Sequence, residues 1–377
     1  MNNMSVRRLY ALFVSGKCNL KCDYCYFPNK NLGDMSLSTA GATLDFIANS
    51  GDRMVDIGFF GVEPTMNFAI IEWFLENAPK KLDDVIFSLN TNGTLLDERR
   101  IELLKDKGVR ISLSLDGSEL THNRHRKTLA DKGSFNLVSK NLPLFVAYSP
   151  PVYVRITLSP DNAPRVGEAL EAVGKMGFSK AGFSLDFTAG YSTAQLAGFH
   201  RSLVEYARIY AEKISKGEVA FVVASLEGAA KRTLPERGLF CGAGVSLFSI
   251  TSDGSIHPCW RYAGEGKRRL GDVFKGIDVS NLTFYESFDN GKYKKCRGCS
   301  FSSRCARCLW VSEKMAGGEY EIAEAQCRCN KALEEAGEIV AKALPATASA
   351  KETDGGILIT DESGMSYLVP IEEWKRL

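Results

Sequence analysis

The chain of 377 residues lacks the features of a membrane or secreted protein. It contains no run of 18 apolar residues, and the early apolar stretch 9–15 is too short to span a bilayer. That stretch is also not followed by a signal-peptide cleavage site, because Gly16 and Lys17 precede Cys18 where small residues are needed. We therefore expect a cytosolic protein that does not bind a membrane.

The sequence also lacks a strong excess of charge of either sign. Its formal net charge is only +2, and the lysines and arginines are scattered along the chain. A protein that binds a phosphate backbone presents them as a basic patch or stripe. Nucleic acid is therefore not an expected partner.

Cysteine is absent from a long central part of the chain and concentrated at two places. Three of the eleven cysteines lie between Cys18 and Cys25, and the other eight lie between Cys241 and Cys329. Cytosolic thiols are kept reduced, and an odd number of cysteines cannot all pair. This distribution indicates metal or iron–sulfur ligands rather than disulfides.

Through residue 216, short strand-like apolar runs alternate with segments of helical period, which predicts repeated βα units and a parallel sheet. The predicted strands are Leu9–Val14, Met54–Phe60, Val85–Asn90, Arg110–Leu115, Val152–Leu158 and Lys180–Ser184. The predicted helices are 38–49 with Ser38 as cap, 67–78, 96–107, 135–142, 164–176 and 194–216. In such folds the chemistry lies at the carboxyl ends of the strands.

The character of the sequence changes near Ser225 to short segments, glycine turns and cysteine pairs. We predict a first domain over 1–225, a smaller cysteine-rich domain over 226–345 and a tail over 346–377. Metal sites are expected to stabilise the second domain, and a helix over 330–343 to close it. In the tail, 344–354 reads as a linker, and 357–360 and 365–369 read as a β-hairpin.

Cys18, Cys22 and Cys25 form a CxxxCxxC loop directly after the first predicted strand. Three thiolates at this spacing can hold three corners of a [4Fe–4S] cube and leave the fourth iron open to a ligand. The alternative is a zinc knuckle, but zinc sites usually have four ligands, and no fourth cysteine or histidine is near. We therefore favour the iron–sulfur cluster.

This loop, with Tyr24 before its last cysteine, resembles the signature of the radical SAM superfamily. The resemblance implies a partial (β/α)6 TIM-like barrel in which the open iron binds the amino and carboxylate groups of S-adenosylmethionine. It also implies one-electron cleavage of that cofactor to a 5′-deoxyadenosyl radical, which abstracts hydrogen from a substrate.

Further stretches at strand ends are similar to motifs of this family. Gly61-Val62-Glu63-Pro64 resembles its GGEP motif, which implies that Glu63 receives the cofactor ammonium group. By the same resemblance Asn90 and Ser114 contact the cofactor, with Ser114 on the ribose, and Arg126 binds its carboxylate. His122 and His125 either touch the active site or begin a solvated helix.

The second cysteine group resembles the SPASM extension of radical SAM enzymes, which holds two auxiliary [4Fe–4S] clusters. The resemblance implies that Cys241, Cys259 and Cys308 bind the first auxiliary cluster. Cys296, Cys299, Cys305 and either Cys327 or Cys329 would bind the second. The remaining cysteine completes the first cluster, or that cluster keeps an open iron. Structural zinc sites are the alternative.

The resemblance favours an enzyme that modifies a peptide or protein after its synthesis. A sulfatase-maturing enzyme, which makes formylglycine, is one alternative, and an enzyme acting on a small molecule such as a tetrapyrrole is another. The sulfatase-maturing members have a general-base aspartate where Trp260 stands here, so Asp253 or Asp186 would have to replace it. An electron-transfer protein is the non-catalytic alternative, but it would need no cofactor pocket.

The expected partners are a peptide substrate and a low-potential electron donor. Because the barrel begins by about Leu9, no N-terminal domain for a leader peptide is expected, and a separate protein could bind the leader. The edge of the terminal hairpin is another candidate peptide-binding site.

Overall fold

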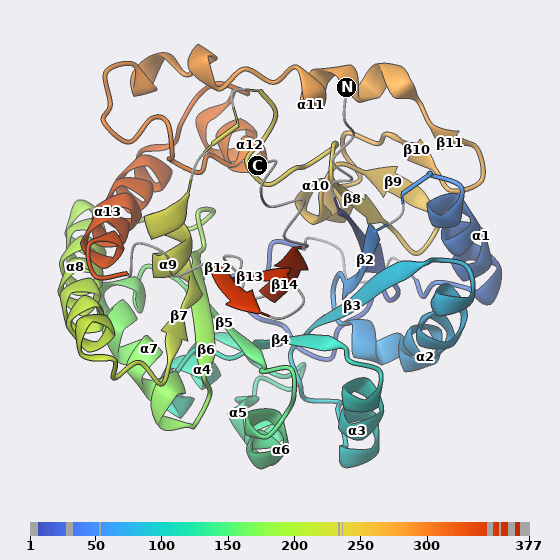
Figure 1. Ribbon diagram of the computed structural model, residues 1–377, viewed down its shortest axis with the longest axis horizontal. Helices are drawn as coiled ribbons and strands as arrows, with labels where there is room; N and C mark the ends of the chain where they lie inside the picture. The colour runs from blue at the N-terminus through green and yellow to red at the C-terminus, as the bar shows by residue number, and fades with distance from the viewer. Residues whose placement is uncertain are drawn as a thin grey trace.

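The computed structural model describes residues 7–27, 33–52, 54–232, 234–235, 237–344, 350–353, 356–360 and 366–369. All six predicted strands are present within one or two residues of their predicted bounds. They are β1 (Arg8–Phe13), β2 (Met54–Phe60), β3 (Asp84–Thr91), β4 (Arg110–Ser114), β5 (Tyr153–Leu158) and β6 (Lys180–Leu185). Neighbouring strands in this series pair in parallel, and the strands curve around a central axis (Figure 1). The predicted α/β barrel is confirmed.

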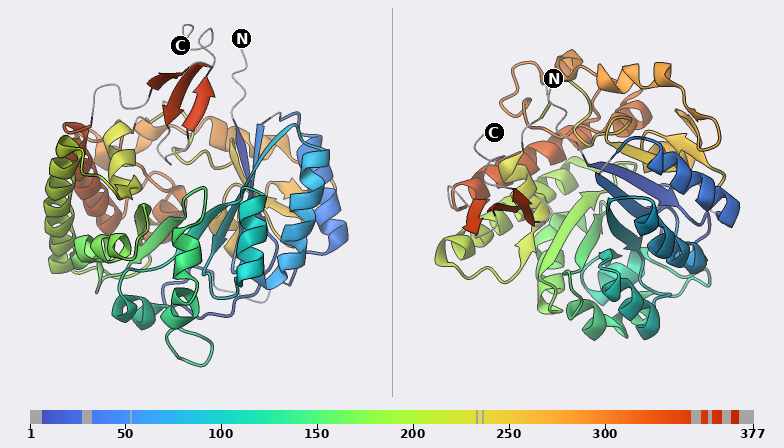
Figure 2. Two further views of the ribbon diagram at one scale, coloured as in Figure 1. Left: turned by 60° about the horizontal axis from the view of Figure 1, so that its bottom comes forward. Right: turned by 45° about the vertical axis from the view of Figure 1, so that its right-hand side comes forward.

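Helices cover the outer face of this sheet (Figures 1 and 2). They are α1 (Leu37–Ala48), α2 (Phe68–Asn77), α3 (Glu98–Asp106), α4 (Glu119–His125), α5 (Phe135–Ser139), α6 (Leu142–Val146), α7 (Val166–Lys175) and α8 (Thr193–Lys216). The predicted cap of the first helix was wrong, because Ser36 rather than Ser38 accepts the backbone N–H of Thr39. The predicted helix 135–142 is two short helices, and α4 was not predicted.

The cysteine-rich part continues the barrel sheet instead of forming a sheet of its own. After β7 (Val222–Val223) and α9 (Ala224–Lys231), strand β8 (Leu247–Ile250) pairs in parallel with β1. Strands β9 (Ser255–His257), β10 (Gly271–Asp272) and β11 (Gly276–Ile277) then extend the sheet in antiparallel fashion. The predicted boundary near Ser225 therefore does not separate two cores, and one apolar core includes residues of both parts.

Short helices and one long helix complete this part: α10 (Trp260–Glu265), α11 (Thr283–Glu286), α12 (Leu309–Val311) and α13 (Glu324–Ala341). Helix α13 packs against α8 and α9. A buried ion pair also joins α13 to the end of α9, because Arg232 lies 2.7 Å from Glu334, which is 1% exposed. Helix α13 begins six residues earlier than the predicted helix.

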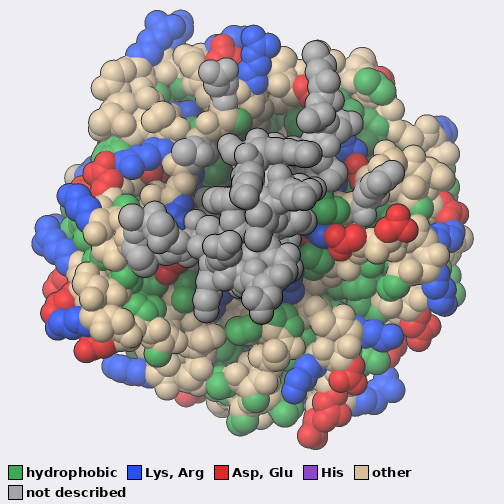
Figure 3. Space-filling model, in the orientation of Figure 1, with side chains coloured by type: hydrophobic (Ala, Val, Ile, Leu, Met, Phe, Trp, Pro, Cys, Tyr) green, Lys and Arg blue, Asp and Glu red, His purple; other side chains and the backbone are tan. Residues whose placement is uncertain are grey.

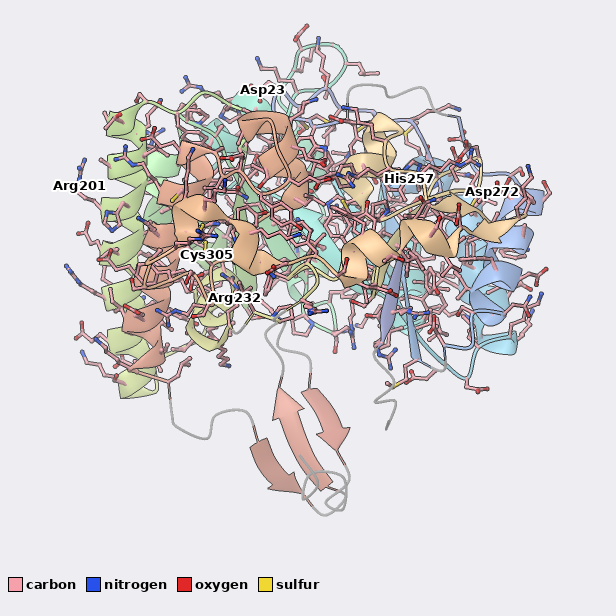
Figure 4. All side chains as sticks on the ribbon, turned by 90° about the horizontal axis from the view of Figure 1, so that it is seen from above. Asp23, Arg201, Arg232, His257, Asp272 and Cys305 are labelled. Carbon is pink, nitrogen blue, oxygen red and sulfur yellow. The ribbon has the colours of Figure 1, made fainter. Side chains whose placement is uncertain are left out.

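The terminal hairpin is confirmed, because β13 (Gly356–Thr360) and β14 (Ser366–Val369) pair in antiparallel fashion. The turn predicted between them lies outside the described residues. The predicted linker 344–354 was wrong in its last residues, since β12 (Ala350–Thr353) adds a third strand. In Figure 4 this sheet lies at the opposite end of the molecule from Asp23, which belongs to the CxxxCxxC loop. Its edge is therefore remote from that loop.

Charged side chains of both signs are interspersed around the rim of the face in Figure 3. No helix in the described part of the chain is long and apolar enough to cross a membrane.

Candidate active site

A pocket at the carboxyl ends of β1 to β6 contains every residue predicted to bind the first cluster or the cofactor. The pocket is lined by Cys18, Cys22, Tyr24, Cys25, Gly61, Glu63, Asn90, Ser114 and Arg126. These residues come from four consecutive βα connections, so the parallel sheet brings them together. Among the described residues, no three His, Cys, Asp or Glu side chains converge on a single-ion site. In a [4Fe–4S] cube, by contrast, each thiolate binds a different iron, so the cysteines do not converge on one point.

The CxxxCxxC loop is held in place by the end of α4 and the residues that directly follow it. The backbone N–H of Lys21 donates to the carbonyl of Lys127 at 2.8 Å, and that of Asp23 donates to the carbonyl of His125 at 3.3 Å. The His125 Nδ1 atom also lies 3.0 Å from both carboxylate oxygens of Asp23. The cysteines of the loop are therefore positioned by contacts from outside the loop.

His125 connects this loop to the end of β5. Its Nε2 atom lies 3.0 Å from the hydroxyl of Ser159 and 3.0 Å from a carboxylate oxygen of Asp161. Its side chain is buried, and the imidazole lies beside the ring of Tyr24, with centroids 5.5 Å apart. His125 does not line the pocket, so its role there is to position the loop.

Glu63 is a buried carboxylate with its oxygens already oriented. One oxygen accepts the backbone N–H and hydroxyl of Thr65 and the hydroxyl of Thr91, and the other accepts the backbone N–H of Asn92 at 2.8 Å. Burial raises the pKa of Glu63, and these donors lower it in part. The second oxygen has a single donor and can accept another from a ligand ammonium group.

Gly61 is the position in its motif where glycine is required. Its φ angle is +110°, and a Cβ atom there would lie 2.9 Å from the ring of Phe13. Val62, which replaces the second glycine of the family motif, lines the pocket with its side chain. The positive φ angle and the ring of Phe13 therefore both require glycine at position 61.

Arg126 belongs to a buried network with Asp116 and Tyr24. Its Nε and Nη2 atoms donate to the two oxygens of Asp116 at 2.8 and 3.0 Å, and the Tyr24 hydroxyl donates to the same carboxylate. Burial alone would raise the pKa of Asp116, but the guanidinium outweighs it, so the pKa is lowered. The network fixes Arg126 and Tyr24 at the pocket wall, and Arg126 Nη1 forms no hydrogen bond with any described residue.

Asn90 and Ser114 point into the pocket from β3 and β4. The Asn90 Oδ1 atom is buried and has no hydrogen-bond partner among the described residues. A buried acceptor without a partner costs free energy unless a ligand or water supplies a donor. Asn90 therefore fits a pocket that holds a polar ligand.

His122 is buried behind this network and outside the pocket. Its Nε2 atom lies 3.0 Å from the Ser134 hydroxyl, and His122 is only 1% exposed. Burial, together with the charge of Arg126, lowers the pKa of His122 to about 4. The folded protein therefore holds this histidine neutral.

We expect His122 to make the protein less stable as the pH falls from 6.5 toward 4. In this range the unfolded chain binds a proton at His122 and the folded chain does not, so the free energy of unfolding decreases by up to about 1.4 kcal/mol per pH unit. Urea unfolding of the wild type and of His122→Asn at several pH values measures this slope. An equal slope in both proteins would contradict the assignment.

The cysteines of the second group fall into two sets. Burial raises the pKa of Cys259 to about 12, and the charges of Cys308 and Cys241 add to it, so these three lie close together. Burial likewise raises the pKa of Cys327, and the charges of Cys296 and Cys299 add to it. Cys305 belongs to this second set, because Cys296 acts on its pKa.

Cys329 lies apart from both sets. It is 1% exposed, burial raises its pKa to about 12, and Arg328 is the charged neighbour that lowers it. Among the described residues no other cysteine contributes to this pKa, whereas the charge of Cys329 acts on Tyr191. The structure thus groups Cys327, and not Cys329, with Cys296, Cys299 and Cys305.

The three candidate catalytic residues lie in different environments. Trp260 lines the pocket and packs on Phe60, with ring centroids 4.7 Å apart. Asp186 also lines it, but one of its oxygens accepts the backbone N–H and hydroxyl of Thr188. Asp253 is not among the residues that line the pocket and is bound within a turn by Thr251 and Ser255.

Sequence analysis missed several pocket residues, among them two arginines, Arg155 and Arg261. Arg155 occupies one of the alternate positions of β5 that are partly exposed, together with Tyr153 and Thr157, while the residues between them are buried. The sequence contained a signal for Arg155, because an arginine that alternates with apolar residues in a strand indicates the inner face of the barrel. Arg261 follows Trp260 in α10 and had no comparable signal.

Residues 12–177 match the family model of the Radical SAM superfamily. This span includes the end of β1, the whole of β2 to β5 and all nine predicted residues of the pocket. The chain therefore carries a radical SAM domain over these residues.

Curated relatives extend the similarity beyond this domain. A cysteine-type anaerobic sulfatase-maturating enzyme of Clostridium perfringens is 24% identical over 321 residues, 79% of this chain and 84% of that protein. The subtilosin biosynthesis protein AlbA of Bacillus subtilis is 25% identical, and the match covers 83% of this chain and 67% of AlbA. The Fe-coproporphyrin III synthase of Methanosarcina barkeri is 25% identical over 82% of both chains.

A solved structure, native anSMEcpe with bound AdoMet and the Kp18Cys peptide, has the same fold. Its TM-score is 0.72 with 22% identity, and the match covers 87% of this chain and 96% of that one. The fold is therefore shared with a known structure over most of the chain.

Proposed function

We propose that this radical SAM enzyme modifies a peptide or protein substrate after its synthesis. The observation that carries the proposal is the convergence of Cys18, Cys22 and Cys25 with Glu63 and Arg126 around one pocket. Relatives named as maturases of a sulfatase and of subtilosin, and a neighbour that binds a peptide, support a peptide as the substrate.

The residues of the pocket fit a [4Fe–4S] cluster and S-adenosylmethionine. The three thiolates would hold three irons, the free acceptor of Glu63 would take the ammonium group, and Arg126 Nη1 would take the carboxylate. Asn90 and Ser114 would face the ribose side, with Tyr24 and Gly61 completing the wall. When bound, cluster and cofactor together supply the 5′-deoxyadenosyl radical that abstracts hydrogen from the substrate.

We also propose two auxiliary [4Fe–4S] clusters. Cys296, Cys299, Cys305 and Cys327 would hold one of them with four thiolates. Cys241, Cys259 and Cys308 would hold the other with three, which leaves one iron open to a further ligand. The mutual influence of these cysteines on their pKa values supports this division, and Cys329 is then a buried thiol outside both clusters.

Cys327→Ala and Cys329→Ala form a matched pair that tests the division, because the two residues are neighbours on one helix. We expect Cys327→Ala to lose up to about four iron atoms per chain after anaerobic reconstitution, the content of one cube. Cys329→Ala should keep the iron content of the wild type. Iron and acid-labile sulfide determination measures both, and the reverse outcome would contradict the assignment.

Formylglycine formation is the less favoured reaction. A general base must accept a proton within hydrogen-bond reach, and the indole of Trp260 cannot do so. Asp253 is engaged in its turn, and Asp186 is the pocket carboxylate that could substitute. A separate leader-binding protein and a low-potential electron donor belong to the proposal as partners.

The function is tested with short peptides encoded beside the gene, incubated anaerobically with the reconstituted enzyme, S-adenosylmethionine and dithionite. We expect peptide-dependent 5′-deoxyadenosine, a mass change in one peptide and transfer of deuterium from that peptide to 5′-deoxyadenosine. Formylglycine in a sulfatase-derived cysteine peptide would instead support the sulfatase-maturing reaction. Turnover of a porphyrin carboxylate without any peptide product would overturn the proposal.

A further inference from the structure

Two arginines of the pocket have no acidic partner. Arg155 projects from β5, and Arg261 belongs to α10. Within the described parts of the chain, neither side chain forms an ion pair or a side-chain hydrogen bond. Arg126, the third arginine of the pocket, differs from them because Asp116 binds it through two hydrogen bonds.

The acids that line the same pocket form no ion pair with these two arginines. Glu63 is bound by Thr65, Thr91 and Asn92. Asp186 accepts two hydrogen bonds from Thr188. The pocket therefore presents two guanidinium groups whose N–H donors have no acceptor among the described residues.

Arg261 is held in a defined position by two aromatic rings. Its guanidinium carbon lies 4.8 Å from the ring centroid of Tyr26 and 4.8 Å from that of Trp310. Stacking on aromatic faces uses the faces of the guanidinium and leaves its N–H groups, which lie in the plane, available to a ligand. The side chain is thus oriented before any anion binds.

Arg155 and Arg261 line the same pocket, although they come from different elements, β5 and α10. Tyr26, on which Arg261 stacks, also lines this pocket. The two guanidinium groups therefore belong to one binding cavity.

This part of the pocket differs from the part that the cofactor would occupy. The proposed cofactor contacts follow β1 to β4, whereas Arg155 and Arg261 come from β5 and α10. Trp260, packed on Phe60, adds an apolar surface next to Arg261. A substrate group with a carboxylate and an adjoining apolar portion fits these surroundings.

We propose that Arg155 and Arg261 together bind a carboxylate of the substrate, so that the preferred substrate is a peptide with an acidic side chain or a free C-terminus close to the residue that reacts. This inference rests on the proposed function, because it requires that the pocket receives a peptide. The planar fork of each arginine can donate two parallel hydrogen bonds to a carboxylate.

The test measures binding of three acetylated heptapeptides to the reconstituted enzyme with S-adenosylmethionine, by anaerobic calorimetry. One peptide has a central glutamate and an amidated end, the second has glutamine instead, and the third has glutamine with a free C-terminal carboxylate. We expect one of the two acids to bind at least about tenfold more tightly than the neutral amide, as for a charge-assisted hydrogen bond. Which acid binds more tightly identifies the source of the carboxylate.

Arg155→Met and Arg261→Met should each remove most of the preference for the acidic peptide over the neutral amide. Arg155→Lys should keep part of this preference, because lysine retains the positive charge but not the planar pair of N–H donors. Arg201→Gln is the control, since Arg201 is an exposed residue of α8 that points away from the barrel (Figure 4). It should preserve the preference. Circular dichroism shows whether each variant is folded.

Equal affinity for acid and amide peptides, or no measurable binding of any of them, would overturn the carboxylate site. Tighter binding of coproporphyrin III than of every acidic peptide would overturn the assignment to a peptide. The proposed function fails separately, if the wild type with its full iron content does not cleave S-adenosylmethionine or modify any peptide.

Discussion

Replacing Cys18, Cys22 and Cys25 together by alanine is expected to abolish cleavage of S-adenosylmethionine and to lower the iron content from about twelve to about eight atoms per chain. The expected loss of cleavage is complete, because the pocket would have no thiolate to hold the iron that the cofactor needs. Iron and sulfide determination after anaerobic reconstitution, together with a 5′-deoxyadenosine assay, measures both effects.

Cys329→Ala is the control for this experiment, because it also removes a thiol but from outside every proposed cluster. It should retain iron and cleavage activity. A wild-type content near four atoms that vanished in the triple variant, with zinc bound elsewhere, would contradict the auxiliary clusters and leave the radical chemistry intact. Loss of iron from all sites in the triple variant would show that the clusters do not assemble independently.

Asp116→Asn is expected to lower the free energy of unfolding by about 3–5 kcal/mol, the usual cost of removing one partner of a buried ion pair. Asp116 is 0% exposed, and the substitution leaves the guanidinium of Arg126 buried without a counter-charge. It also removes the acceptor that holds Tyr24. Anaerobic urea unfolding, followed by circular dichroism, measures the stability, and calorimetry measures the affinity for S-adenosylmethionine.

Glu212→Gln is the matched control, because it neutralises a carboxylate of an exposed ion pair with Lys216 on α8. We expect little change in stability or cofactor affinity, as is usual for exposed pairs. The pH dependence gives a second check. The pKa of Asp116 is lowered in the folded state, so its contribution is present above the unfolded value near 3.9 and lost as the pH falls through the folded value. Equal stability of Asp116→Asn and the wild type would disprove this role.

The barrel could be predicted because its strands are short apolar runs whose period differs from that of the helices. The predicted bounds of β2 agree with the structure at both ends, and the other strands agree within one or two residues. The pocket residues could be predicted because parallel strands bring their carboxyl ends together, so motifs far apart in sequence become neighbours. The resemblance to a known family then gave each of them a role to test.

Other features depend on contacts between distant residues and were not predictable. The pairing of β8 with β1 joins residues more than two hundred positions apart, and the short segment Leu247–Ile250 has no feature that specifies its partner. The position of Cys329 away from Cys327 depends on how α13 rotates against α8. The burial of Asp116 with Arg126 became apparent only from the fold.

The pairing of β8 with β1 has a consequence for synthesis on the ribosome. Until Leu247 to Ile250 have been made, one edge of β1 has no partner, and this strand leads directly into the loop with the first three cysteines. At about 5–20 residues per second the edge stays unpaired for tens of seconds. Unpaired strand edges recruit other chains. Nascent chains cut off before residue 247 should therefore aggregate, and chaperones that shield β1 should increase the yield of protein able to receive its first cluster.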